Sequence, residues 1–123
     1  MIKIIVQDLD EGNQEVLSLA LQSEGFKVLA LSATEEVVER VESFSPNLII
    51  LDFFMSGGES IKTCKELRLK YPSIPVIASS CNADINVQYE KHGFNGYLAK
   101  PFDITDLGLK VREYLIQVGE TQQ

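Results

Sequence analysis

The sequence predicts an α/β fold, a single five-stranded parallel sheet with helices on both of its faces. The first observation is a continuous apolar run at residues 48–51, between Ser45-Pro46 and Gly57-Gly58, which is typical of a strand buried on both faces. The second is that short apolar or β-branched runs alternate with stretches of helical spacing. The third is that the connections are short, so we expect right-handed crossovers and no second domain.

The first part of the chain predicts two strands and the helix between them. Residues 2–6 form a short β-branched run, which has the composition and length of a strand. Residues 13–24 carry apolar side chains at helical spacing, and Gly25 follows them as a helix-ending glycine does. The apolar run at residues 26–31 predicts the second strand.

The middle of the chain predicts the second helix, the buried strand and the third helix. Ser32-Ala-Thr-Glu35 has the pattern of a capping box, which satisfies the first backbone amides of a helix. Pro46 closes that helix, and the strand at residues 48–51 follows. Apolar side chains on one face mark the third helix: Ile61, Cys64 and Leu67.

The last part predicts two strands, one weak helix and one strong helix. Residues 76–79 predict the fourth strand, and residues 97–99 predict a short fifth strand. The helix between them, at residues 83–92, has few apolar side chains, so we expect it to dock loosely and to be mobile. Asp103 is expected to cap the last helix.

Length and composition are those of one globular domain. The 123 residues are 45% hydrophobic and 24% charged, enough to bury a core without disulfides or metal. We assign residues 1–118 to the domain and residues 119–123 to a polar, frayed tail. The formal net charge of -7 argues against direct binding of nucleic acid or of an anionic membrane, because both need a basic patch.

The same features predict a cytoplasmic protein. No apolar stretch reaches the ~18 residues that a membrane helix needs, and the N-terminus lacks the layout of a signal peptide. Cys64 and Cys81 form no CxxC pair and are interpreted as reduced, buried side chains. No DNA-binding domain follows residue 123, so we expect a stand-alone domain whose output is a protein contact, unless the chain is part of a longer protein.

Acidic residues are expected to meet at one edge of the sheet. Five strand–helix units favour the flavodoxin-like strand order 2-1-3-4-5, in which ligands bind at the switch point between strands 1 and 3. Asp8 and Asp52 follow these two strands. The loops at the same edge also carry Asp10, Ser80 and Lys100.

These residue types suit phosphoryl transfer. Carboxylates without a nearby histidine favour a hard cation, Mg²⁺ before zinc. An aspartate can act as the nucleophile and form an acyl phosphate. A lysine and a hydroxyl can then neutralise and hold the phosphoryl oxygens.

Four motifs give the chain its resemblance to the receiver domain of bacterial two-component response regulators. Together they span nearly the whole chain in the family's order. They are the acidic loop after Ile4-Ile5-Val6, the strand end Leu48-Ile-Ile-Leu-Asp52, the strand end Val76-Ile-Ala-Ser-Ser80, and Tyr97-Leu-Ala-Lys100-Pro101-Phe102.

The resemblance implies roles for four residues. Asp52 would be the phospho-acceptor, supplied by a histidine kinase or a phosphotransfer protein. Lys100 would pair with the acyl phosphate and precede a cis bond to Pro101. Ser80 would turn toward the phosphate and Tyr97 would swing inward behind it. This would change the surface of the fourth helix, fifth strand and last helix, where a downstream protein target or a homodimer partner would bind.

The resemblance also implies a Mg²⁺ site, from which this chain departs. The ligands would be Asp8, Asp52 and the backbone carbonyl of Phe54, but Leu9 stands where the family usually has a second acid. We therefore expect weakened Mg²⁺ binding, with water filling the gap. Asp10 would compensate only by turning inward, and a solvated position near a helix N-terminus is the stronger interpretation for it.

A second departure lies in the loop after Asp52. Ser56 stands at a usual proline and Ser60 at a usual glycine. Gly57 and Gly58 are expected to take over the turn.

Two other functions remain open at this point. Leu9 allows a degenerate receiver, a protein-binding module that takes no phosphate. The segment Asp8-Leu9-Asp10 is also similar to the Asp-x-Asp strand end of haloacid-dehalogenase-like phosphatases, with Asp8 as nucleophile. The receiver is the preferred interpretation, and as a receiver the chain would be no enzyme beyond catalysing its own phosphorylation and dephosphorylation.

Overall fold

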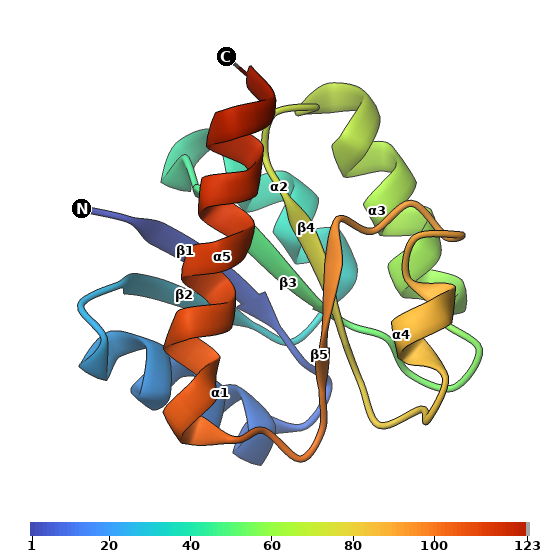
Figure 1. Ribbon diagram of the computed structural model, residues 1–123. Helices are drawn as coiled ribbons and strands as arrows, with labels where there is room; N and C mark the ends of the chain where they lie inside the picture. The colour runs from blue at the N-terminus through green and yellow to red at the C-terminus, as the bar shows by residue number, and fades with distance from the viewer. Residues whose placement is uncertain (123) are drawn as a thin grey trace.

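Five parallel strands and five helices alternate in residues 1–122, for which the computed structural model describes the backbone; side chains are described for residues 1–116 (Figure 1). The strand order is β2-β1-β3-β4-β5, which confirms the predicted order. The elements are β1 Lys3–Gln7, α1 Glu11–Ser23, β2 Lys27–Leu31, α2 Thr34–Phe44, β3 Leu48–Asp52, α3 Gly58–Lys70, β4 Val76–Ser80, α4 Ile85–Gln88, β5 Gly96–Ala99 and α5 Ile104–Gln122.

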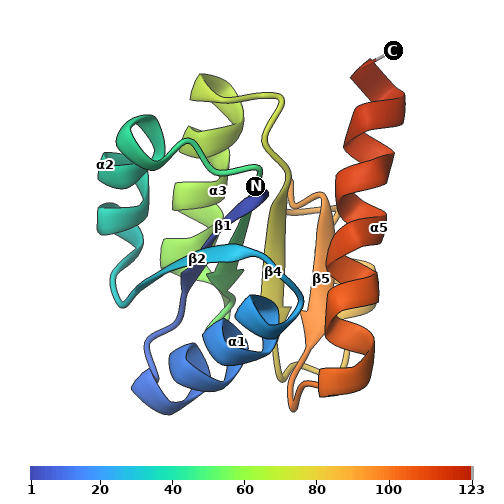
Figure 2. The same cartoon turned by 90° about the vertical axis from the view of Figure 1, so that its left-hand side faces the viewer.

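Helices cover both faces of the sheet, α1 and α5 on one side and α2 and α3 on the other (Figure 2). Alternate residues of the strands therefore enter two separate cores. Ile5, Ile49 and Leu51 face the side of α2 and α3. Ile4 and Ile50 face the side of α1 and α5. All of these side chains are fully buried, as the continuous apolar pattern of the central strands predicts.

Two local predictions were wrong. Helix α2 starts one residue later than the Ser32–Glu35 pattern predicts: Ala33 is the N-cap residue, and its N–H donates to Oε1 of Glu36 at 3.2 Å. The Ser32 hydroxyl instead accepts from the Gln14 side chain at 2.9 Å. Cys81 is exposed, because it follows the last residue of β4 in a surface loop.

Cys64 is buried as predicted, on the face of α3 that meets the sheet. Burial raises the pKa of its thiol to about 11, so the thiol stays protonated at neutral pH. It is therefore a core residue and no nucleophile.

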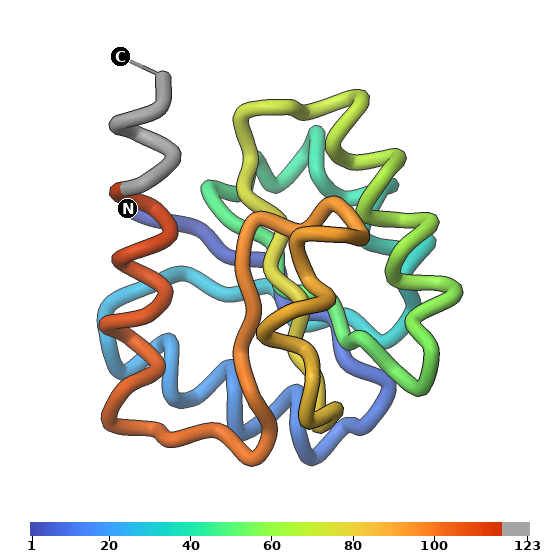
Figure 3. Tube along the Cα trace, turned by 45° about the vertical axis from the view of Figure 1, so that its right-hand side comes forward, coloured from blue at the N-terminus to red at the C-terminus, as the bar shows by residue number. Residues whose placement is uncertain are grey.

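The predicted weak helix forms only a single turn. Helix α4 lies in the segment that connects β4 to β5 (Figure 3), and Ile85 anchors it in the core with 3% of its surface exposed. Its predicted mobility stays a prediction.

Helix α5 begins after Asp103, whose carboxylate accepts from the Thr105 N–H at 3.0 Å. The predicted tail at 119–123 lies outside the described side chains, and the boundary at 118 stays a prediction.

Glycine is required where α5 crosses β5. A Cβ atom at Gly96 would lie 2.2 Å from the ring of Tyr114. The Tyr114 hydroxyl donates to the Tyr97 carbonyl at 3.0 Å and accepts from the Tyr97 N–H at 3.1 Å. These two hydrogen bonds fix the backbone of β5 at Tyr97.

Gly96→Ala is expected to lower the free energy of unfolding by about 2 kcal/mol, because the methyl group displaces the Tyr114 ring. Urea unfolding followed by circular dichroism measures the change. The matched control is Gly58→Ala, at the first residue of α3 with no atom within 4 Å, where the change should stay within about 0.5 kcal/mol. Equal changes for the two variants would contradict the packing argument.

None of the helices in the described part of the chain has both the length and the apolar character that a bilayer span requires.

Candidate functional site

Three charged side chains meet at the carboxyl edge of the sheet. Asp8 follows β1 directly, Asp52 is the last residue of β3, and Lys100 follows β5 directly. Because β1 and β3 are neighbours in the sheet, their strand ends place the two carboxylates side by side. Strand β4 separates β3 from β5, and the long lysine side chain spans this distance.

The lysine binds both carboxylates. Its Nζ lies 2.8 Å from Oδ1 of Asp52 and 2.9 Å from Oδ2 of Asp8. Asp8 is 1% exposed and Asp52 is 7% exposed. One ammonium thus faces two largely buried carboxylates, which leaves one negative charge uncompensated.

The carboxylates determine the titration of Lys100. Burial disfavours the charged lysine, but hydrogen bonds and charge attraction from Asp52 and Asp8 outweigh it and hold the pKa of Lys100 above its usual value. The lysine is therefore a fixed positive charge at neutral pH.

Backbone and amide groups hold Asp52 in place. The Leu9 N–H donates to Oδ2 of Asp52 at 3.2 Å, so Leu9 contributes its amide while its side chain is exposed. The Asp52 N–H donates to Oε1 of Gln7 at 3.0 Å, and the Gln7 Nε2 donates to the Ser32 carbonyl at 2.8 Å. Gln7 was missed by the sequence reasoning. The sequence did carry a signal for Gln7: it is a polar residue at the end of a strand, directly before the acidic loop.

The carboxylate of Asp10 caps a helix instead of pairing with Lys100. Its Oδ1 accepts from the Asn13 N–H at 3.0 Å, which makes Asp10 the N-cap of α1. Its own N–H donates to Oδ1 of Asp8 at 2.9 Å. The geometry therefore supports the helix-terminal interpretation of Asp10 and gives its metal role no support.

Ser80 is buried at the end of β4, but its hydroxyl faces its own loop. Its Oγ accepts from the Asn82 N–H at 3.0 Å. The Asn82 side chain in turn donates to the Met55 carbonyl at 3.0 Å, which ties the loop after β4 to the loop after β3. The Ser80 hydroxyl contacts neither Asp52 nor Lys100 through a hydrogen bond within the described residues.

Tyr97 is half-buried on β5, and its ring lies 5.2 Å from the ring of Tyr89. The bond between Lys100 and Pro101 is cis, which confirms the expectation from the resemblance.

In the loop after Asp52, Gly57 adopts a positive φ of 82°. Its Cα lies against the ring of Phe53, where a Cβ atom would lie 2.4 Å from the ring carbons. The expectation that glycine takes over the turn is therefore confirmed for Gly57, whereas Gly58 is the first residue of α3.

A cavity of about 580 Å³ opens over the charged group, and Asp8, Asp52 and Lys100 all line it. The Phe54 carbonyl accepts one hydrogen bond, from the Gly57 N–H at 2.9 Å, and so keeps a second lone pair. Across the described residues, no three acidic, histidine or cysteine side chains converge in a way that would hold a metal ion. Asp8, Asp52 and the Phe54 carbonyl are oxygen donors at this cavity that a cation could use.

Comparison with known proteins points to one family. A family profile described as "Response regulator receiver domain" matches residues 4–112. The DNA-binding transcriptional regulator NtrC of Escherichia coli (strain K12) is 29% identical over 121 residues, which cover 96% of this chain and 26% of NtrC. The alkaline phosphatase synthesis transcriptional regulatory protein PhoP of Bacillus subtilis (strain 168) is 30% identical over 116 residues, which cover 92% of this chain and 48% of PhoP. The chain thus spans a quarter to a half of these relatives.

Solved structures share the fold. A CheY-like response regulator receiver domain protein of Methanospirillum hungatei JF-1 superposes with a TM-score of 0.85 at 20% identity, over 98% of both chains. NtrX of Brucella abortus, in complex with ATP, superposes with a TM-score of 0.87 at 19% identity, over 99% of this chain and 28% of NtrX.

Proposed function

Because this chain belongs to the response regulator receiver domain family, and so acts in two-component signal transduction, we propose that it accepts a phosphoryl group on Asp52. The observation that carries this proposal is the position of Asp52. It is an acid at the end of a central strand, 7% exposed, with Lys100 at 2.8 Å and an open cavity above.

The donor is a phosphohistidine of a histidine kinase or of a phosphotransfer protein. A carboxylate oxygen of Asp52 attacks the phosphorus, the phosphorus–nitrogen bond breaks, and the imidazole leaves with the electron pair. Lys100 balances the charge that the phosphoryl oxygens bring, because its ammonium is already held at Asp52. The Leu9 amide, which donates to Asp52, helps fix the orientation of the carboxylate.

Receiver domains generally bind Mg²⁺ for phosphorylation, and the donors of this chain fit a partly hydrated ion. Asp8, Asp52 and the Phe54 carbonyl would hold it, and Mg²⁺ keeps several waters in most sites. Bound there, it would supply positive charge against the phosphoryl oxygens. The Leu9 side chain supplies no oxygen, so we propose weaker binding than a third carboxylate would give. We leave Asp10 out of this set because its Oδ1 caps α1.

Leu9→Asp is expected to raise the affinity for Mg²⁺ about tenfold, because it adds a charged oxygen ligand next to Asp8. Mg²⁺ titration followed by backbone amide NMR shifts measures the dissociation constant. Leu9→Asn is the matched control, since it has the same shape without the charge and should gain less. An unchanged affinity in Leu9→Asp would show that position 9 does not face the ion.

We further propose that phosphorylation changes the surface formed by α4, β5 and α5. Ser80 would exchange its bond with the Asn82 amide for a phosphoryl oxygen, and Tyr97 would move inward behind it. A downstream protein target, or a second copy of the chain, would bind that surface.

We propose a cytoplasmic protein that makes no direct contact with nucleic acid or a membrane. We also propose that it has no catalytic activity beyond its own phosphorylation and dephosphorylation.

Incubation with acetyl phosphate and Mg²⁺, followed by intact-mass measurement, tests the proposed function. One phosphoryl group per chain supports it, and absence of labelling at every Mg²⁺ concentration supports the degenerate receiver instead. The phosphatase alternative needs Asp10 as the acid beside Asp8. Its support is weak, because Asp10 caps α1 and Asp8 is 1% exposed.

A further inference from the structure

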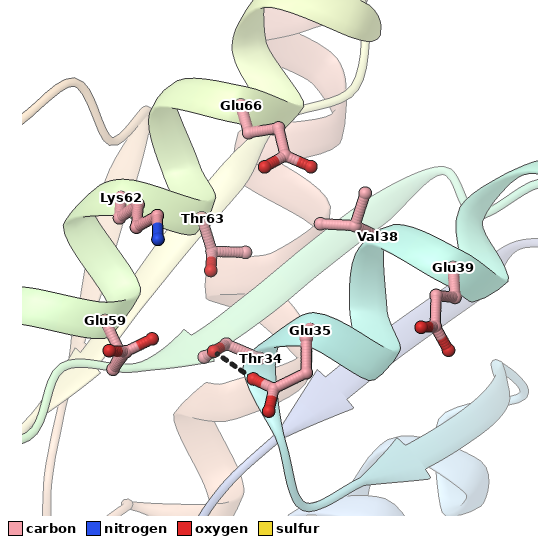
Figure 4. A pocket seen from close by; sticks show the side chains of 8 residues that line it. All are labelled: Thr34, Glu35, Val38, Glu39, Glu59, Lys62, Thr63 and Glu66. Atoms are coloured by element: carbon pink, nitrogen blue, oxygen red, sulfur yellow. Dashed lines mark hydrogen bonds between the residues drawn. The ribbon is translucent and has the colours of Figure 1, made fainter.

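A second cavity lies between α2 and α3, outside the group around Asp52. It measures about 560 Å³ and opens to solvent along the two helices (Figure 4). Four carboxylates line it, two from each helix: Glu35, Glu39, Glu59 and Glu66. We call this the α2–α3 groove.

The charge of the groove is unbalanced. Lys62 is its one cationic lining residue, so four carboxylates and one ammonium give a net charge of -3. Within the described residues, none of the four carboxylates forms an ion pair within 4.0 Å. Glu35 and Glu39 are four residues apart on α2, a spacing at which like charges destabilise a helix.

Helix termini explain only half of these acids. Glu35 and Glu59 lie in the first turns of α2 and α3, where negative charge is favourable in any protein. Glu39 and Glu66 lie further along their helices, beyond the reach of that effect. The helix dipole therefore does not account for Glu39 and Glu66, which are exposed acids on the groove.

Thr63 gives an independent indication of a ligand. It lies on α3 and is only 7% exposed, yet its hydroxyl has no hydrogen-bond partner among the described residues. Figure 4 shows this side chain directed into the groove, between the acids of the two helices. The hydroxyl oxygen is not one of the fully enclosed polar atoms, so it opens onto the groove and is free to accept a hydrogen bond there. A donor placed in the groove would satisfy it.

The arrangement of the acids favours an extended cation over a metal ion. No group of three acidic side chains in the described part of the chain converges as metal ligands do. The carboxylates are instead distributed along the two helices. We propose that the α2–α3 groove binds a lysine- or arginine-bearing segment of a partner protein, with the basic side chains between the glutamates and one N–H donating to Thr63.

The location of this groove gives it a further consequence. Thr34, Glu35 and Glu59 also line the neighbouring cavity that reaches Asp52. The basic segment would therefore lie next to the phospho-acceptor, on the face of the sheet opposite α1 and α5 (Figure 2). This surface is separate from the α4, β5 and α5 surface proposed for the switch, and its occupancy requires no phosphorylation.

A short amidated oligo-arginine peptide tests the proposal by isothermal titration calorimetry on the full chain. Replacing Glu39 and Glu66 together by Gln should weaken binding about tenfold. The control replaces Glu15 and Glu113 by Gln, two exposed acids on α1 and α5, and should weaken binding less than about twofold. Both double variants change the net charge equally.

Two further measurements separate the groove from general attraction. Thr63→Val keeps the side-chain shape and removes only the hydroxyl, so it should weaken binding of the peptide about threefold. Backbone amide shifts on peptide addition should concentrate on α2 and α3. Equal weakening by the two double variants, or shifts spread over α1 and α5, would overturn the proposal.

Discussion

Asp52→Asn is expected to abolish labelling by acetyl phosphate completely, with no mass increment at any Mg²⁺ concentration. The amide is nearly the same size as the carboxylate, but it is no nucleophile toward phosphorus. Lys100 keeps its contact with Asp8 at 2.9 Å in this variant, so the fold should remain intact. Intact-mass spectrometry measures the loss, and circular dichroism confirms the fold.

The matched control for this experiment is Asp10→Asn. Asparagine caps helices as well as aspartate does, so the N-cap of α1 should survive and labelling should be unchanged. Labelling that persists in Asp52→Asn would move the acceptor to another residue. Asp8 would then be the first candidate, and the phosphatase alternative would regain support.

Lys100→Met is expected to lower the free energy of unfolding by about 3 kcal/mol at neutral pH without Mg²⁺. The substitution removes the ammonium and leaves Asp8 and Asp52 as two largely buried carboxylates without a counter-charge. Urea unfolding measures the difference. The control is Lys110→Met on the exposed side of α5, which should change stability by less than about 0.5 kcal/mol.

The pH dependence of this difference separates a charge effect from a packing effect. The pKa of Lys100 is raised above 10.5, so its stabilisation is complete below that value and is lost as pH rises through the higher folded-state pKa. A difference that stays constant across pH would assign the effect to packing.

Sequence reasoning predicted most of the fold because its signals were local. The apolar run at residues 48–51 required a strand covered on both faces, and the alternation of strands with helices required a parallel sheet. The predictions that failed were also local, but they depended on single residues. Helix α2 begins one residue after the predicted capping box, and Cys81 lies in a loop rather than in the core.

The sequence by itself determined which acids lie at the switch point of the sheet, since strand order brings Asp8 and Asp52 together wherever the chain folds this way. Only the tertiary structure decided how they are paired. Lys100 reaches both carboxylates, Gln7 holds the backbone of Asp52, and Asp10 turns outward to cap α1. These contacts depend on side-chain directions and on distances between segments far apart in the chain. Periodicity and residue type carry no information on side-chain directions or on those distances.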